Sequence, residues 1–184
     1  MRIFWGSLLV LFSGLSCSKN LLSEFAKTTT DEALYFEALK LTDEKKYTLA
    51  ISKFNALSAG YVAKRDVQAK FAAAYAGRCG LDLMSLVDKI TSDTTTNFFT
   101  LVMKAFTGSV ATNIDDCIAA EAKIYAINTD ANLRTADENV LMAFIAVAKM
   151  GAIMATYADL DANKVADTGF DSCLVAQLPD DYAR

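Results

Sequence analysis

Residues that interrupt helices are rare in this sequence, and their rarity limits the folds it can adopt. The 184 residues include a single proline, Pro179, and eight glycines. Proline and glycine are the residues least compatible with a helix interior, so long stretches can be helical without interruption. Alanine, leucine and lysine, which favour helices over strands, are abundant. We therefore predict an all-α protein built from antiparallel helix pairs.

Helix starts and stops are marked at several points. Thr29 with Glu32, and Thr135 with Glu138, have the spacing of a capping box at a helix N-terminus. Gly80 is expected to end a helix, because glycine is common just after the last helical residue. Apolar residues recur at helical spacing between these signals. The predicted helices are at about 30–43, 47–57, 63–79, 81–90, 94–107, 113–127, 136–158 and 171–178.

The first 16 residues have the order of a secretory signal. Arg2 is their only charge, an apolar run follows at 3–12, and small residues precede Cys17. The run is too short for the roughly 20 residues that a membrane-spanning helix needs. We therefore predict a signal peptide at 1–16 and export of the rest of the chain.

The sequence at 14–17, Gly-Leu-Ser-Cys, resembles the lipobox of bacterial lipoproteins. The leucine stands one position later than in the family, so an ordinary secreted protein remains the alternative. The resemblance implies lipidation of Cys17, a tether at 17–30 and a helical domain at 31–184. Ser18 after the cysteine implies the outer membrane, where such lipoproteins face the periplasm or the cell surface.

The charge and the missing histidines exclude several function classes. The net charge is −4 and no block of basic residues occurs, so nucleic-acid binding is not expected. The chain has no histidine, and histidine is the commonest metal ligand and the side chain that most readily exchanges protons near neutral pH. No catalytic constellation is recognisable, and we expect no enzyme.

The segment 34–57 resembles a tetratricopeptide repeat, in which two antiparallel helices pack closely through small residues. The matching positions are Ala38, Tyr47, Ala50, Phe54 and Leu57. A second, degenerate unit can be placed on 69–90, and the match ends after Ser92. Glu37 and Val62 depart from the family pattern, and an irregular helical bundle is the alternative. The resemblance implies a groove for a partner, lined by Glu32, Tyr35, Leu39 and Thr42.

A long apolar stretch occupies 139–158 and is interrupted by Lys149 near its centre. Its length permits a membrane span, but a central lysine is costly in a bilayer. A helix that is apolar on all sides is otherwise the central member of a bundle. We predict this central, buried helix.

An acidic segment follows that helix. Asp159, Asp161, Asn163 and Asp167 fall at positions 1, 3, 5 and 9 of a loop, the spacing of an EF-hand-like calcium site. Lys164 replaces the glycine of position 6, and Phe170 replaces the glutamate of position 12. The alternatives are a structural Ca²⁺ site, the only cofactor we expect, and a solvated acidic connection.

Besides Cys17, the chain has three cysteines, Cys79, Cys117 and Cys173. An exported protein can keep a disulfide. Cys117 and Cys173 each follow an acidic, turn-like segment, whereas Cys79 lies in an alanine-rich helical stretch. We predict a Cys117–Cys173 disulfide and a buried Cys79 thiol, with three free thiols as the alternative.

Together these features predict an interaction module anchored in the cell envelope, whose partner is an envelope protein or a peptide. The alternative is a periplasmic lipoprotein of the kind associated with solute transporters, which would hold a small apolar ligand in a cavity near Met142, Phe144 and Met154. A structural envelope protein without a ligand is a third possibility.

Overall fold

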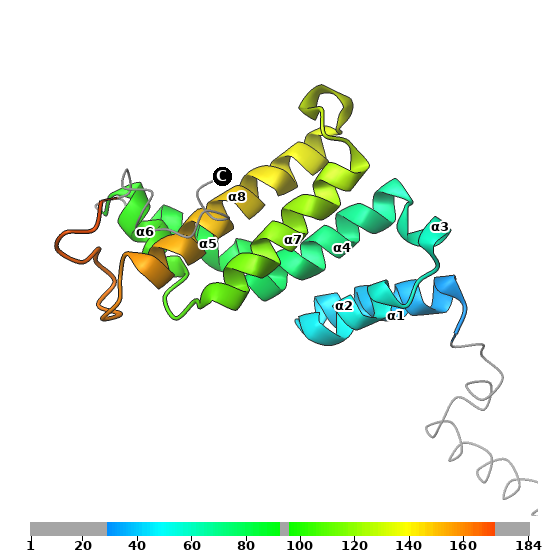
Figure 1. The fold of residues 1–184 in the computed structure, drawn as a ribbon, viewed down its shortest axis with the longest axis horizontal. Helices are drawn as coiled ribbons and strands as arrows, with labels where there is room; N and C mark the ends of the chain where they lie inside the picture. The colour runs from blue at the N-terminus through cyan, green and yellow to red at the C-terminus, as the bar shows by residue number, and fades with distance from the viewer. Residues whose placement is uncertain (1–28, 93–95, 172–184) are drawn as a thin grey trace, which may run out of the picture. The chain divides into compact units, whose positions relative to one another are not determined.

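A computed structural model describes residues 29–92 and 96–171, apart from the side chain of Ile90. Every regular element in these ranges is helical (Figure 1), which confirms the all-α class. By their contacts the residues divide into Met1–Thr30 and Asp31–Arg184, and the helices described below all belong to the second unit. The helices are α1 (Asp31–Asp43), α2 (Tyr47–Asn55), α3 (Ala59–Val62), α4 (Arg65–Cys79), α5 (Leu83–Ser92), α6 (Phe98–Ala105), α7 (Ala111–Ile127), the 3-10 turn η1 (Ala131–Leu133) and α8 (Ala136–Tyr157).

Two helix ends are formed by the residues that the sequence indicated. Thr135 Oγ1 accepts a hydrogen bond from the backbone N–H of Glu138 at 3.3 Å, and the Glu138 carboxylate accepts one from Thr135 N–H at 2.7 Å. This capping box begins α8. Gly80 follows α4 with φ of 109°, a left-handed conformation that glycine adopts without steric cost. The predicted helix at 171–178 lies almost wholly outside the described residues.

Helices α1 and α2 form an antiparallel pair that packs through alanines. Ala38 and Ala50, the small positions expected from the repeat resemblance, are both fully buried. Because each side chain is a single methyl group, the two helix backbones can approach closely. Phe54 of α2 then stacks on Phe71 of α4 with ring centroids 4.8 Å apart. An aromatic core therefore joins this pair to the rest of the unit.

The second repeat-like pair is not formed, so that prediction is wrong. Helix α4 packs chiefly along α7, and α5 packs on α6. Ala72 and Ala76 of α4 belong to a buried cluster with Ala120 and Ile124 of α7. The small side chains of α4 thus serve a partner that is distant in sequence. Beyond α2 the bundle is irregular.

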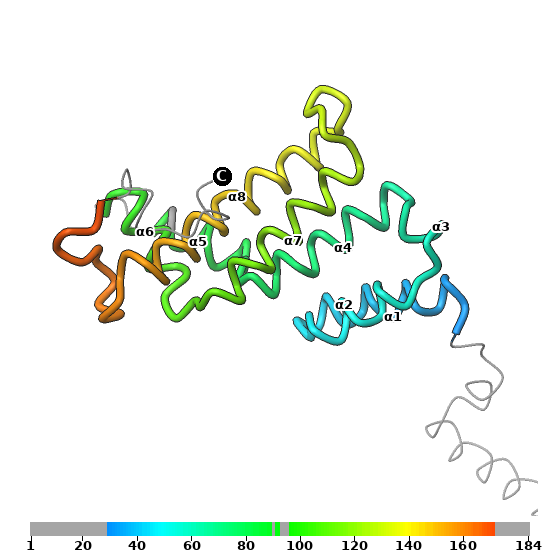
Figure 2. Tube along the Cα trace, viewed as in Figure 1, coloured from blue at the N-terminus to red at the C-terminus, as the bar shows by residue number. Residues whose placement is uncertain are grey.

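The three longest helices, α4, α7 and α8, lie side by side, and neighbours run in opposite directions (Figures 1 and 2). Short connections lead from α7 through η1 into α8. At the other end of α8, a buried cluster contains Val102 of α6 and Phe106, the residue that follows α6, together with Ala148 and Ala152. Helix α6 is therefore held against the second half of α8.

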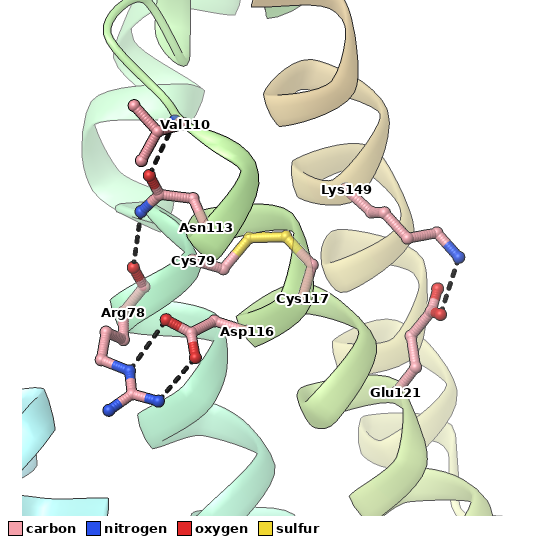
Figure 3. Close-up of a disulfide and its surroundings, with 8 residues drawn as sticks. All are labelled: Arg78, Cys79, Val110, Asn113, Asp116, Cys117, Glu121 and Lys149. Carbon is pink, nitrogen blue, oxygen red and sulfur yellow. Dashed lines mark hydrogen bonds and ion pairs between the residues drawn. A yellow bond between two sulfur atoms is a disulfide. The ribbon is translucent and has the colours of Figure 1, made fainter. Parts of the chain in front are cut away.

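Helix α8 is only partly buried, which corrects the prediction of burial on all sides; its coverage is greatest around Gly151, Ala152 and Ile153. It is long and apolar enough to cross a membrane by length and composition, and 28% of its most apolar stretch is buried in the protein. Ile145, Ala148 and Ala152 face the interior, whereas Val140 is 53% exposed. Lys149 is accommodated by an ion pair with Glu121 of α7, at 2.7 Å (Figure 3). Pairing of this kind offsets the cost of removing a charge from water.

A second ion pair ties α4 to the start of α8. Arg65 Nε lies 2.6 Å from Glu138 Oε1, and the Glu138 side chain is only 8% exposed. The hydrogen bonds from Arg65 are the main reason that the pKa of Glu138 falls from 4.5 to about 2, and the N–H of Thr135 contributes. The folded state therefore favours the ionised carboxylate.

This lowered pKa predicts how stability depends on pH. The contribution of Glu138 is fully present above its unfolded pKa of 4.5 and is lost as the pH falls toward the folded value of about 2. In Glu138→Gln the side chain cannot titrate. The free energy of unfolding, measured by urea titration, should differ most between the wild type and this variant at pH 6, and the difference should shrink between pH 4.5 and 2. A constant difference over that range would contradict the coupling.

Candidate functional site

The residues of the predicted groove lie on α1, but its apolar members are partly covered by the protein itself. The Tyr35 ring lies 6.2 Å from the ring of Phe54 and 5.9 Å from that of Tyr61. Burial, with Asp66 and Tyr61 nearby, raises the pKa of Tyr35. Leu39 packs against the same cluster. These two side chains therefore contribute to the interior at least as much as to a surface.

The two polar residues of the predicted groove differ in how exposed they are. Glu32 is exposed. Thr42 is partly buried, and its hydroxyl donates to the carbonyl of Ala38, one turn earlier, at 2.9 Å. Of the four residues predicted to contact a partner, Glu32 is thus the one that projects most freely from α1.

A more exposed apolar surface lies on α5 and α6. Met84 is 81% exposed and Phe99 58% exposed. Leu83, Val87 and Phe98 are also exposed. We call these five side chains the α5–α6 surface. The sequence did not predict this surface, although both helices are amphipathic, which is the pattern that indicates an apolar face.

A pocket lies beside the same two helices. Its volume is about 350 Å³, and its described lining includes three lysines. The lining residues are Lys89, Ser92, Leu101, Lys104 and Lys164. Lys89 and Lys104 come from the two helices, and Lys164 comes from the segment that follows α8.

The segment that follows α8 brings three carboxylates together. Oxygens of Asp159, Asp161 and Asp167 lie within 4.8 Å of one another. Asn163 lies in the same loop and accepts a hydrogen bond from Val165 N–H at 2.8 Å. The sequence spacing thus correctly identified residues that meet in space.

Backbone N–H groups hold two of these carboxylates in place. Asp159 Oδ2 accepts from Lys164 N–H, and Asp167 Oδ2 accepts from Leu160 N–H, each at 2.9 Å. Lys164 has φ of 72°, so it adopts the left-handed conformation for which glycine is usual at this loop position. The replacement of that glycine by lysine has therefore not prevented the turn.

The loop positions differ in the oxygen ligands that they can offer to a cation. Asp159 is 4% exposed, and its Oδ1 has no hydrogen-bond partner among the described residues. At the twelfth position, Phe170 packs against the buried cluster of α6 and α8 and offers no side-chain oxygen. The site therefore has three carboxylates and lacks the bidentate glutamate of an EF-hand.

The disulfide joins Cys79 at the end of α4 to Cys117 of α7 (Figure 3). The predicted Cys117–Cys173 pairing is wrong, as is the free thiol at Cys79, although Cys79 is buried as expected. The Cα atoms are 5.1 Å apart, within the usual range for a disulfide. Because α4 packs along α7, this spacing is available to Cys79, whereas Cys173 lies outside the described residues.

Polar contacts on either side of the disulfide align the same two helices (Figure 3). Arg78 Nε and Nη2 contact the two carboxylate oxygens of Asp116 at 2.8 and 2.6 Å. Asn113 accepts from the N–H of Val110 at 2.9 Å and donates to the carbonyl of Arg78 at 3.1 Å. The hydrogen bonds that Arg78 donates to the Asp116 carboxylate raise the pKa of Arg78, which therefore remains charged.

The residues of the predicted cavity for a small ligand pack against different clusters. Met154 packs against the cluster of α6 and α8, and Met142 against the cluster between α4 and α7. Cys17, the predicted lipidation site, lies outside the described residues. Comparisons with family models, curated proteins and solved structures give no match.

Proposed function

We propose that this chain is a membrane-anchored interaction module of the cell envelope, and that it binds its partner through the α5–α6 surface. The observation that carries the proposal is the exposure of five large apolar side chains on two adjacent helices. Exposed apolar patches on a protein surface mark sites of protein or membrane interaction. The groove on α1 is the second candidate, because Glu32 is exposed beside Tyr35 and Leu39.

The lysines of the neighbouring pocket indicate the chemistry of the partner. Lys89 and Lys104 stand on the helices that carry the apolar side chains, and Lys164 adds a third charge. A partner helix with an apolar face flanked by acidic residues is complementary to both features. We therefore propose an envelope protein that presents such a helix.

Export and anchoring are supported by two independent features. Disulfides persist mainly in oxidising compartments outside the cytosol, and Cys79 is joined to Cys117. The order of residues at 1–17 resembles a lipoprotein signal, with the leucine one position late. Lipidation of Cys17 would hold the protein at a membrane, since two or more acyl chains give stable attachment.

Anchoring can be tested on the mature protein itself. We expect intact mass spectrometry to find a chain that begins at Cys17 and carries the mass of acyl groups. A chain that begins elsewhere, or that carries no acyl mass, would contradict the anchor without bearing on the α5–α6 surface.

The binding surface can be tested with photo-crosslinking side chains placed at single positions in the cell envelope. Crosslinks to one protein partner are expected from position 84 or 99 and not from Leu133, which is 61% exposed on η1 and serves as the matched control. Met84→Glu combined with Phe99→Glu should reduce the recovered partner by about tenfold, because charged groups must then be desolvated.

The same experiment separates the competing surfaces. Crosslinks from Glu32 and none from position 84 would overturn the α5–α6 surface and favour the groove on α1. Equal crosslinking from Leu133 would indicate nonspecific contact and would likewise overturn it.

A further inference from the structure

The loop of residues 159–170, which we call the acidic loop, holds a buried oxygen without a partner. Asp159 is 4% exposed, and its Oδ1 receives no hydrogen bond from any described residue. Buried polar groups are normally paired, because leaving one unpaired forfeits its interaction with water. A carboxylate oxygen in this position calls for a hydrogen-bond donor or a cation.

Two further carboxylates lie close to Asp159. Carboxylate oxygens of Asp161 and Asp167 lie within 4.8 Å of an oxygen of Asp159 and of each other. Like charges at this spacing repel, and the repulsion is stronger near buried groups than in water. A cation placed between the three carboxylates would remove the repulsion and would also pair Asp159.

We propose that the acidic loop binds a calcium ion through Asp159, Asp161 and Asp167, with Asn163 as an additional oxygen donor. All four side chains offer oxygen, and calcium is a hard cation that takes six to eight oxygen ligands in flexible geometry. Magnesium requires a stricter octahedral arrangement, and zinc or copper would favour the nitrogen and sulfur ligands that this loop lacks.

The ligand set also predicts a modest affinity. Phe170 packs into the apolar cluster of α6 and α8, so the position that supplies a bidentate glutamate in tight sites supplies no side-chain oxygen here. We expect a dissociation constant of about 10⁻⁴–10⁻³ M, the range of calcium modules that work outside cells.

Bound calcium would stabilise the junction between α8 and the acidic loop. Asp167 N–H donates to the carbonyl of Ala158, the residue after α8, at 2.6 Å, and Phe170 anchors the far end of the loop. Lys164 belongs to the acidic loop and lines the pocket on α5 and α6. The ion would therefore also order one wall of that pocket, although the site does not depend on any partner.

The test uses the full-length protein after treatment with a chelator. Isothermal titration with CaCl₂ should give a saturable signal for one ion, and titration with MgCl₂ a much weaker one. At about 10 mM CaCl₂, Tm should rise by roughly 3–8 °C over its value in chelator, because the ion binds only the folded state.

Two variants locate the ion. Asp161→Asn and Asp167→Asn, each at a residue that is not fully buried, should weaken calcium binding by about tenfold or more while the helical signal in circular dichroism is retained. Asp43→Asn removes one exposed carboxylate from α1 and should leave binding unchanged. Absence of calcium binding in the wild type would overturn the proposal, and so would binding that is equally strong in all three variants.

Discussion

Replacing both Cys79 and Cys117 by alanine is expected to lower the free energy of unfolding by about 4 kcal/mol. The disulfide closes a loop with a sequence separation of 38 residues. Such a crosslink stabilises a protein mainly by restricting the unfolded chain, and the effect grows with the length of the closed loop. Urea titration followed by far-ultraviolet circular dichroism measures the difference.

Cys173→Ala is the matched control for this experiment. If Cys79 is joined to Cys117, the control should unfold like the wild type. Addition of a reducing agent should then lower the stability of the wild type and the control toward that of the double variant. A loss of stability in Cys173→Ala that matches the double variant would contradict the Cys79–Cys117 pairing.

Replacing Gly151 by leucine is expected to destabilise the protein by about 3 kcal/mol, because it adds volume to a packed interface. A Cβ atom at Gly151 would overlap the ring of Phe106 and the Val102 side chain on α6. Glycine is thus required at this point of α8 for close approach of the two helices. Since α6 carries part of the α5–α6 surface, the substitution should also disturb that surface.

Gly60→Leu provides the comparison for Gly151→Leu. A Cβ atom at Gly60 would meet no atom within 4 Å, and replacement of a helical glycine reduces the entropy of the unfolded chain. We expect this variant to be as stable as the wild type or slightly more stable in the same urea titration. Equal destabilisation by the two substitutions would show that close packing at Gly151 is not the cause.

Features that depend on neighbouring residues were predictable from the sequence. Thr135 and Glu138 are three residues apart, and their mutual hydrogen bonds form wherever a helix begins at this spacing. Gly80 ends α4 because glycine tolerates a left-handed backbone. The three aspartates of the acidic loop meet because alternate side chains of a tight turn point to one side. In each case the chain within a few residues determines the geometry.

The packing of α8 could not be predicted in the same way. Its apolar composition predicted burial on all sides, yet the helix is only partly covered, because the number of helices packed against it depends on the whole bundle. The α5–α6 surface was missed for a related reason. An amphipathic helix predicts an apolar face, but only the arrangement of the other helices decides whether that face is covered.

The sequence by itself determined the helical class, several helix ends, the burial of Ala38 and Ala50, and the residues that form the acidic loop. Tertiary structure decided that α4 packs along α7, and with it that Cys79 lies opposite Cys117. The physical reason is distance along the chain. Hydrogen bonds at helix ends and steric limits on the backbone act between near neighbours, whereas the pairing of helices minimises exposed apolar area over the whole bundle. Many different pairings are compatible with the same pattern of apolar residues along each helix.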